Sequence, residues 1–124
     1  MSKAASLIYV ADDDPSILEL VSIILTRGGF DVIGYDTADA LMAALATRAP
    51  TAVLLDVRIP GRSGLDALKA IKDDPATAGI PVLMLTGDGR LDRIVQAMQL
   101  GAAGYVMKPF DGAQLVERVE SLLI

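Results

Sequence analysis

A short apolar run that ends in a single carboxylate is the feature that most constrains this chain. The run extends from Thr51 to Leu55 and is followed by Asp56 and by a turn at Pro60 and Gly61. It is continuous rather than alternating, which is typical of a strand buried on both faces in a parallel sheet. Because helices cover both faces of such sheets, the run predicts an α/β fold. Asp56 would then lie at the carboxyl edge of the sheet, where open α/β folds place their sites.

Four more segments have the character of strands, and a pattern typical of an amphipathic helix follows each of the five. The predicted strands are residues 7–11, 30–35, 51–56, 80–86 and 105–107, and the predicted helices begin near residues 14, 37, 63, 91 and 111. Asp14 before Pro15 is a typical helix cap, and Gly34 favours a sheet edge for the second strand. Together these units predict a flavodoxin-like (βα)5 doubly wound sandwich, with a parallel five-stranded sheet of order 2-1-3-4-5.

The composition argues against several classes of function. The chain contains neither cysteine nor histidine, so it has no disulfide, no thiolate ligand and no histidine general base. Its net charge of −5, with scattered cations, argues against direct nucleic-acid binding. No apolar run approaches the roughly 18 residues of a membrane span, and we expect no signal peptide. We expect basic residues such as Lys72 on solvated faces and the methionines in the core.

Polar residues follow three of the predicted strands at the same edge of the sheet. Asp12 and Asp13 come after the first strand, Asp56 ends the third, and Lys108 follows the fifth. The ends of the first and third strands flank the crevice at which the strand order reverses. Three neighbouring carboxylates repel one another, and Mg²⁺ together with the Lys108 ammonium would neutralise them. With the hydroxyl of Thr86 nearby, the cluster predicts a phosphoryl-transfer site in which Asp56 forms an acyl phosphate.

These residues, at these spacings, resemble the receiver domain of the two-component response-regulator family. The resemblance covers essentially the whole chain, and it is carried by Asp12, Asp13, Asp56, Thr86 and Lys108-Pro109. It implies a single receiver domain over residues 1–124, with no output domain in this chain. It also implies phosphorelay signalling, in which Asp56 accepts a phosphoryl group from a histidine kinase or a histidine phosphotransfer protein. The chain would not be an enzyme beyond its self-catalysed phosphotransfer and autodephosphorylation.

The resemblance also implies roles for single residues. The ligands of Mg²⁺ would be Asp12, Asp13, Asp56 and the backbone carbonyl of Arg58. The catalytic residues would be Asp56, Lys108 and Thr86. The switch pair would be Thr86 and Tyr105, with the hydroxyl moving to the phosphoryl group as the ring turns inward. Pro109 would follow a cis peptide bond.

The implied output is a change in the face formed by the fourth helix, the fifth strand and the fifth helix. A downstream protein target or a fused output domain would read this face. We expect a cytoplasmic protein that binds neither nucleic acid nor membrane and is a monomer or weak dimer, since Ala103-Gly104 lacks the acidic pair of the branch that dimerises through this face. Arg58 stands where the family more often carries Met or Asn, and we consider Asp88 as its partner.

Three other functions are compatible with parts of the pattern. Asp12-x-Asp14 after a strand resembles the opening motif of a small Mg²⁺-dependent haloacid-dehalogenase-type phosphatase, but the chain lacks room for that fold's later acidic motif and cap. A flavodoxin-like cofactor binder is disfavoured because carboxylates in the first turn would repel a phosphate. A non-phosphorylated pseudo-receiver that serves as an interaction module is disfavoured by the intact set of site residues.

Overall fold

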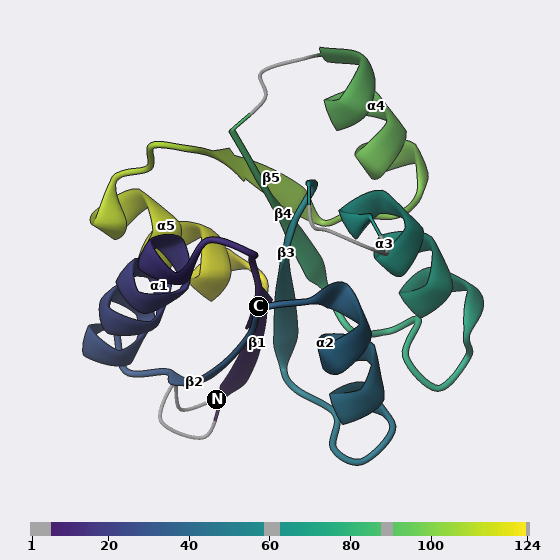
Figure 1. Ribbon diagram of the computed structural model, residues 1–124, viewed down its shortest axis with the longest axis horizontal. Coiled ribbons are helices and arrows are strands. Elements are labelled where there is room, and N and C mark those ends of the chain that lie inside the picture. Colours follow the sequence, from purple (N-terminus) through teal and green to yellow (C-terminus); the bar gives the residue numbers. More distant parts are fainter. Residues whose placement is uncertain (1–5, 59–62, 88–90, 124) are drawn as a thin grey trace.

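The computed structural model describes residues 6–58, 63–87 and 91–123, in which strands and helices alternate along the chain (Figure 1). The strands are β1 (Leu7–Ala11), β2 (Asp31–Tyr35), β3 (Ala52–Asp56), β4 (Val82–Thr86) and β5 (Gly104–Met107). The helices are α1 (Pro15–Arg27), α2 (Ala38–Leu45), α3 (Gly64–Asp73), α4 (Leu91–Gln99) and α5 (Gly112–Ser121). The strands form one parallel sheet of order β2-β1-β3-β4-β5. The predicted fold and the edge position of β2 are therefore confirmed.

The sheet lies between two layers of helices, with α1 and α5 on one face and α2 and α3 on the other (Figure 1). β1, β3 and β4 are buried along their whole length, which explains their continuous apolar sequences. Under α1 and α5 the core includes Val21, Leu25, Leu115 and Val119. Under α2 and α3 it includes Leu41, Leu45, Leu68 and Ile71.

Side-chain caps define where most of the helices begin. The Asp14 carboxylate accepts a hydrogen bond from the Ser16 amide at 2.9 Å, as the sequence predicted for α1. Thr37 caps α2, Ser63 caps α3 and Asp111 caps α5 in the same way. Each cap follows a strand or its loop closely, so the helices start near the carboxyl edge of the sheet.

Three strands, β2, β3 and β4, begin later than the sequence predicted, and β3 does so by one residue, at Ala52. Ile80 and Pro81 precede β4, because proline has no amide to donate to a ladder, although the Pro81 carbonyl still accepts a hydrogen bond from the Val53 amide at 3.0 Å. Phe30 precedes β2, and its amide instead donates to the Leu25 carbonyl, which closes the end of α1.

Two expectations about side-chain location were wrong. Lys72 is half-buried rather than on a solvated face, and its Nζ donates to the Ala78 and Ile80 carbonyls at 3.0 and 2.7 Å. Among the methionines, Met84 is in the core, but Met98 on α4 and Met107 on β5 are 45% and 44% exposed. Burial of these residues depends on what packs against them from other elements.

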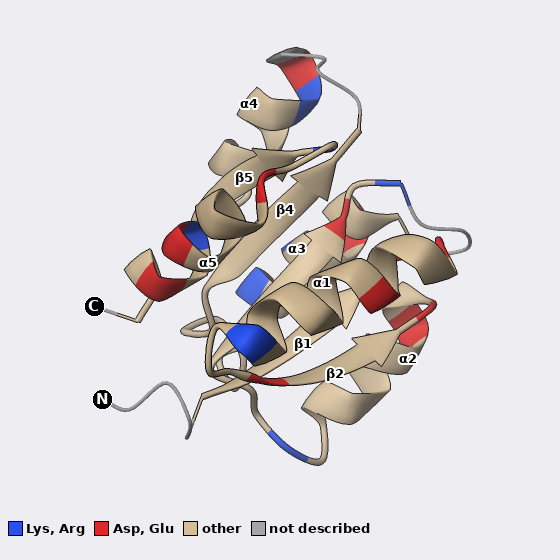
Figure 2. Ribbon diagram, turned by 90° about the vertical axis from the view of Figure 1, so that its left-hand side faces the viewer, with Lys and Arg blue, Asp and Glu red and all other residues tan. Residues whose placement is uncertain are grey.

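Charged residues lie mainly on helices and in loops, whereas the strands are apolar over most of their length (Figure 2). Acidic residues at the strand ends are the exception, and they lead to the site described below. Among the described residues, no helix has both the length and the apolar character needed to cross a membrane.

Candidate functional site

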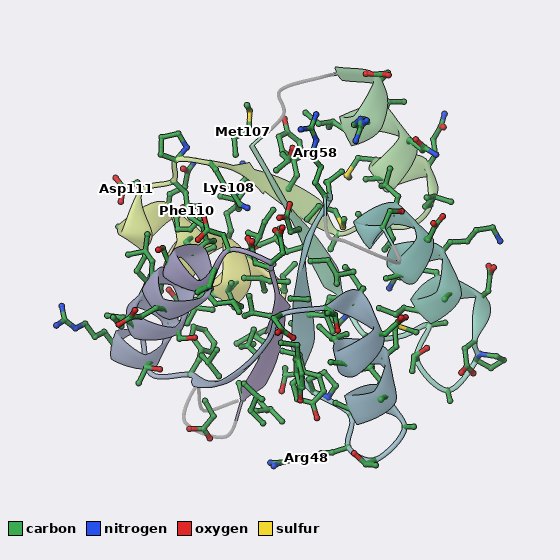
Figure 3. All side chains as sticks on the ribbon, in the orientation of Figure 1. Arg48, Arg58, Met107, Lys108, Phe110 and Asp111 are labelled. Atoms are coloured by element: carbon green, nitrogen blue, oxygen red, sulfur yellow. The ribbon has the colours of Figure 1, made fainter. Side chains whose placement is uncertain are left out.

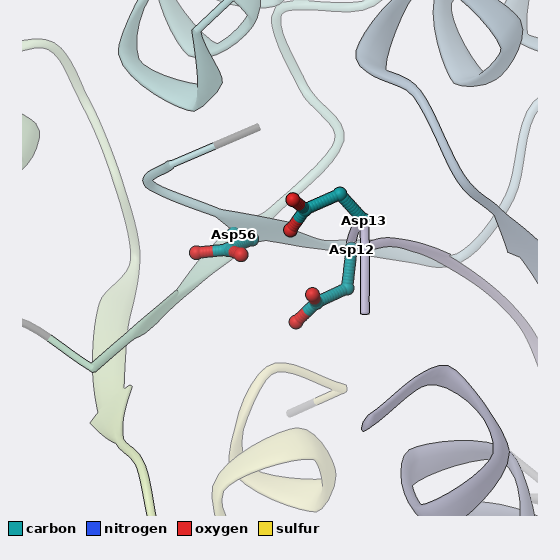
Figure 4. Close-up of side chains that lie close together, drawn as sticks. All are labelled: Asp12, Asp13 and Asp56. Carbon is teal, nitrogen blue, oxygen red and sulfur yellow. The ribbon is translucent and has the colours of Figure 1, made fainter. Parts of the chain in front are cut away.

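Two buried carboxylates meet at the carboxyl edge of the sheet. Asp12 directly follows β1, and Asp56 is the last residue of β3. Because Ala11 pairs with Leu55 across these two strands, Asp12 and Asp56 become neighbours. Asp12 is fully buried and Asp56 is only 5% exposed, whereas Asp13 is exposed. One carboxylate oxygen from each of the three lies within 4.8 Å of the other two, and Figure 4 shows the three side chains converging.

Hydrogen bonds hold both buried carboxylates in place. The Asp12 Oδ1 atom accepts a hydrogen bond from the Asp14 amide at 3.0 Å, and the Asp56 Oδ1 atom accepts one from the Arg58 amide at 3.1 Å. In both cases the chain turns back on its own side chain two residues later, which is typical of Asp in turns. The second oxygen of each carboxylate accepts a hydrogen bond from the Lys108 ammonium.

The Lys108 ammonium lies between the two buried carboxylates. Its Nζ atom is 2.6 Å from Asp12 Oδ2 and 3.2 Å from Asp56 Oδ2. The Lys108 amide donates to the Thr86 carbonyl at 2.7 Å, which ties the end of β5 to the end of β4. Lys108 and Arg58 lie at one end of the molecule, and Arg48 lies at the opposite end (Figure 3). The peptide bond between Lys108 and Pro109 is cis, as the sequence predicted.

Burial and charge act on these groups in opposite directions. Burial raises the pKa of the Asp56 carboxyl, and the nearby Asp12 charge adds to this, although the Arg58 amide and the Lys108 ammonium partly oppose it. Burial by itself would lower the pKa of Lys108, but its hydrogen bond to Asp12 and the charges of Asp56 and Asp12 outweigh burial and raise it. The Lys108 ammonium is therefore favoured in its charged form, whereas the charged form of the Asp56 carboxyl is disfavoured.

A cavity of about 550 Å³ opens over these groups. Its lining consists of Asp12, Asp13, Asp14, Asp56, Val57, Arg58, Thr86, Gly87 and Lys108. The structure thus brings the predicted ligands and catalytic residues into one pocket. Val57 was missed because its apolar side chain reads as a continuation of the strand. Asp14 was assigned only as a helix cap, and it lines the pocket as well.

Tyr105 does not line this pocket. It is half-buried on β5 and packs against the core under α2 and α3. Its partner across the sheet is Met84, two residues before the buried Thr86. Asp88, considered from the sequence as a partner of Arg58, lies outside the described residues.

The donor set of the pocket fits a hard divalent cation. All three converging side chains offer carboxylate oxygens, which are the ligands that Mg²⁺ prefers. Three carboxylates against one ammonium leave an excess of two negative charges, which a divalent cation would neutralise. The Arg58 backbone lies at the same turn, and Thr86 closes the floor of the pocket.

In a parallel sheet of this order, the paired acids and the lysine lie at the switch point, where doubly wound α/β domains bind their ligands. The family model of the response regulator receiver domain matches residues 8–120, and the chain belongs to this family. The chain is therefore a receiver domain of the kind found in two-component response regulators.

Relatives agree with this assignment. The DNA-binding response regulator MtrA of Mycolicibacterium smegmatis is 42% identical over 118 residues, covering 94% of this chain and 50% of that protein. The phosphate regulon transcriptional regulatory protein PhoB of Pseudomonas aeruginosa is 33% identical over 116 residues, covering 94% and 51%. The chain thus spans about half the length of these relatives.

Solved structures show the same architecture. The receiver domain of NtrX from Brucella abortus superposes with a TM-score of 0.88 at 35% identity, covering 94% of this chain and 97% of that one. The chemotaxis response regulator CheY4 of Vibrio cholerae superposes with a TM-score of 0.89 at 24% identity, covering 95% and 98%. At that lower identity the second comparison shows the fold alone.

Proposed function

We propose that Asp56 accepts a phosphoryl group from the phosphohistidine of a histidine kinase or a histidine phosphotransfer protein, in a Mg²⁺-dependent reaction. The observation that carries this proposal is the Lys108 ammonium, 2.6 Å from Asp12 and 3.2 Å from Asp56, in a pocket that also contains Asp13 and Thr86. Phosphoryl transfer depends mainly on positioning and charge neutralisation, and these groups supply both. The chain would process no separate substrate beyond its own phosphorylation and dephosphorylation.

In the proposed reaction a carboxylate oxygen of Asp56 attacks the phosphorus atom. The new oxygen–phosphorus bond forms as the bond to the donor nitrogen breaks, and the electron pair returns to that nitrogen. Lys108 is within reach of Asp56 and would bind an oxygen of the incoming phosphoryl group. Bound Mg²⁺, held by Asp12, Asp13, Asp56 and the Arg58 carbonyl, would supply positive charge for the phosphoryl oxygens. The Thr86 hydroxyl would donate to another of these oxygens.

Incubation with acetyl phosphate and Mg²⁺ tests the acceptor. We expect intact-mass spectrometry to detect one added phosphoryl group, located on Asp56 by peptide mapping and absent in Asp56→Asn. Thr86→Ala should still be labelled, because Thr86 assists rather than accepts. Continuous release of phosphate that requires Asp12 and leaves Asp56 unmodified would instead favour a phosphatase. A protein that takes up no phosphate under any of these conditions would be a pseudo-receiver.

We further propose that phosphorylation is transmitted to the α4-β5-α5 face. The acyl phosphate brings additional negative charge and acceptor oxygens to the pocket, and Thr86 and Lys108 would move toward them. Tyr105, which is half-buried and packs against the core under α2 and α3, would turn further inward. Val95, Met98 and Met107 are exposed apolar residues on α4 and β5, and they give a partner a surface to bind. A protein target or a linked output domain would read this face.

Beryllofluoride, which mimics the acyl phosphate, tests the transmission. We expect amide chemical shifts in α4, β5 and α5 to change on addition, and the changes in β5 to diminish in Thr86→Ala. Shifts confined to the pocket residues would contradict the transmission without affecting the assignment of Asp56. We also expect the unphosphorylated protein to sediment as a monomer or weak dimer and to reside in the cytoplasm.

A further inference from the structure

Gly64, the first residue of α3, touches the backbone of Asp56. A Cβ atom placed on Gly64 would lie 2.0 Å from the Asp56 carbonyl oxygen, 2.8 Å from its carbonyl carbon and 3.0 Å from the Val57 Cα atom. Contacts below 3.0 Å are essentially never made by real Cβ atoms. The reason for glycine is space rather than conformation, since Gly29 and Gly101 are the positive-φ glycines of the described residues. Gly64 is buried, so solvent does not reach the contact between Gly64 and the Asp56 carbonyl from the α3 side.

The backbone that Gly64 touches is hydrogen-bonded on two sides. The Val57 amide donates to the Leu85 carbonyl of β4 at 2.9 Å, and the Val57 carbonyl accepts from the Gly64 amide at 3.1 Å. The next amide, that of Arg58, donates to the Asp56 side chain. These hydrogen bonds hold the backbone of Asp56 and Val57 between β4 and the first turn of α3. The position of the Asp56 carboxylate therefore depends on how closely β4 and α3 approach this backbone.

We propose that Gly64 is a positioning residue for the Asp56 carboxylate. Its missing side chain lets α3 approach the Asp56 carbonyl closely, and this approach sets the carboxylate and the Arg58 backbone relative to Lys108. The proposal deepens the proposed function and rests on it only for the phosphorylation readout. Gly64 itself contacts no reacting atom.

An alanine at this position cannot be accommodated by a side-chain rotation, because the atoms it meets belong to the backbone. Either the first turn of α3 moves away or the peptide between Asp56 and Val57 rotates. Both displace the Asp56 carboxylate relative to Lys108 and Asp12. A displacement of about 1 Å in a catalytic constellation can lower a rate by about 100-fold. We therefore expect Gly64→Ala to slow phosphorylation of Asp56 by about 10- to 100-fold and to weaken Mg²⁺ binding.

The experiment compares Gly64→Ala with two controls. Gly79→Ala is the matched glycine control, because a Cβ atom there meets nothing within 4 Å. Val119→Ala, in the core under α5, is the control for loss of stability away from the site. Mg²⁺ affinity and the amide shifts of Val57 and Arg58 are measured by NMR, and labelling by acetyl phosphate is followed at a temperature where all proteins are folded. Both controls should keep the wild-type Mg²⁺ affinity and labelling rate.

A folded Gly64→Ala with wild-type Mg²⁺ affinity and labelling rate would overturn the proposal, as would an equal loss in Val119→Ala. If the wild type takes no phosphoryl group on Asp56, the proposed function fails, and the Mg²⁺ affinity and amide shifts still decide the role of Gly64. If Gly64→Ala does not fold alone, it is combined with Asp56→Asn, which removes one of the repelling carboxylates. Unchanged Val57 and Arg58 shifts relative to Asp56→Asn would then refute the positioning role.

Discussion

Two buried carboxylates share a single ammonium at the edge of this sheet, although their like charges repel each other. Asp12 and Asp56 are almost completely removed from solvent, yet Lys108 is the one cation that hydrogen-bonds to both among the described residues. Burial raises the pKa of Asp56, and the Asp12 charge adds to it. Charged Asp56 therefore costs the folded protein free energy, and an added cation would relieve that cost.

We predict that Asp56→Asn raises the free energy of unfolding at pH 7, without divalent cations, by about 0.5–2 kcal/mol. The folded protein keeps the Asp56 proton to a higher pH than the unfolded chain does. The stability contributed by this group is therefore lost as pH rises through the interval between the two pKa values. Asp56→Asn should lack this loss. Urea unfolding at pH 7 and at about pH 4 measures the difference.

Asp36→Asn serves as the control for this experiment, because Asp36 is an exposed acid between β2 and α2. It should unfold like the wild type at both pH values. If Asp56→Asn has the wild-type free energy of unfolding at pH 7, the charge on Asp56 does not destabilise the folded protein, and the prediction is wrong.

Lys72 connects the helix α3 to the loops that lead into β4 and β5. Its ammonium donates to the Ala78 and Ile80 carbonyls in the connection to β4. Its methylene groups pack against Gly101, which has a φ of 105° and would meet the Lys72 Cγ atom at 3.3 Å if it carried a Cβ. Burial lowers the pKa of Lys72. One side chain thus joins α3, the loop before β4 and the loop before β5.

We predict that Lys72→Met lowers the free energy of unfolding by about 1–2 kcal/mol, because two carbonyls lose their donor while the apolar stem is largely kept. Lys69→Met is the matched control on the same helix. Lys69 pairs with Asp73 at a site where both side chains are more than 60% exposed, and its loss should not be measurable. Urea unfolding of the two variants checks this difference, and equal stabilities would refute the role of Lys72.

At the scale of the whole molecule, the site joins segments that follow or end four different strands. The ends of β1, β3 and β4 and the residue after β5 each contribute to one pocket, so a ligand bound there links segments that are distant in sequence. A cation that binds the folded chain and not the unfolded chain stabilises the entire domain by mass action.

We predict that the melting temperature of the protein rises progressively with the Mg²⁺ concentration. At a concentration 100 times the dissociation constant, the free energy of unfolding should be higher by about 2.7 kcal/mol. Asp13→Asn should melt like the wild type without Mg²⁺, because Asp13 is exposed, and should lose most of the Mg²⁺-dependent rise. Asp36→Asn should keep the full rise. Differential scanning calorimetry across a Mg²⁺ series provides the measurement, and a wild type that does not respond would contradict the metal site.

The sequence by itself determined the five βα units, the order of the sheet, the caps at Asp14 and Ser63 and the meeting of Asp12, Asp56 and Lys108. These features depend on local signals. Continuous apolar runs mark buried parallel strands, and a polar residue at the end of such a strand must lie at the carboxyl edge. Because parallel strands all end at the same edge, strand order suffices to bring such residues together.

Only the tertiary structure decided the surroundings of Lys72, the exposure of Met98 and Met107, and the contact between Gly64 and the Asp56 carbonyl. Each of these depends on which atoms of distant segments approach one another, and at what distance. Residue types and their periodicity carry no such distances. The residues of the pocket could therefore be predicted from the sequence. The contacts that hold Asp56 in place could be identified only from the tertiary structure.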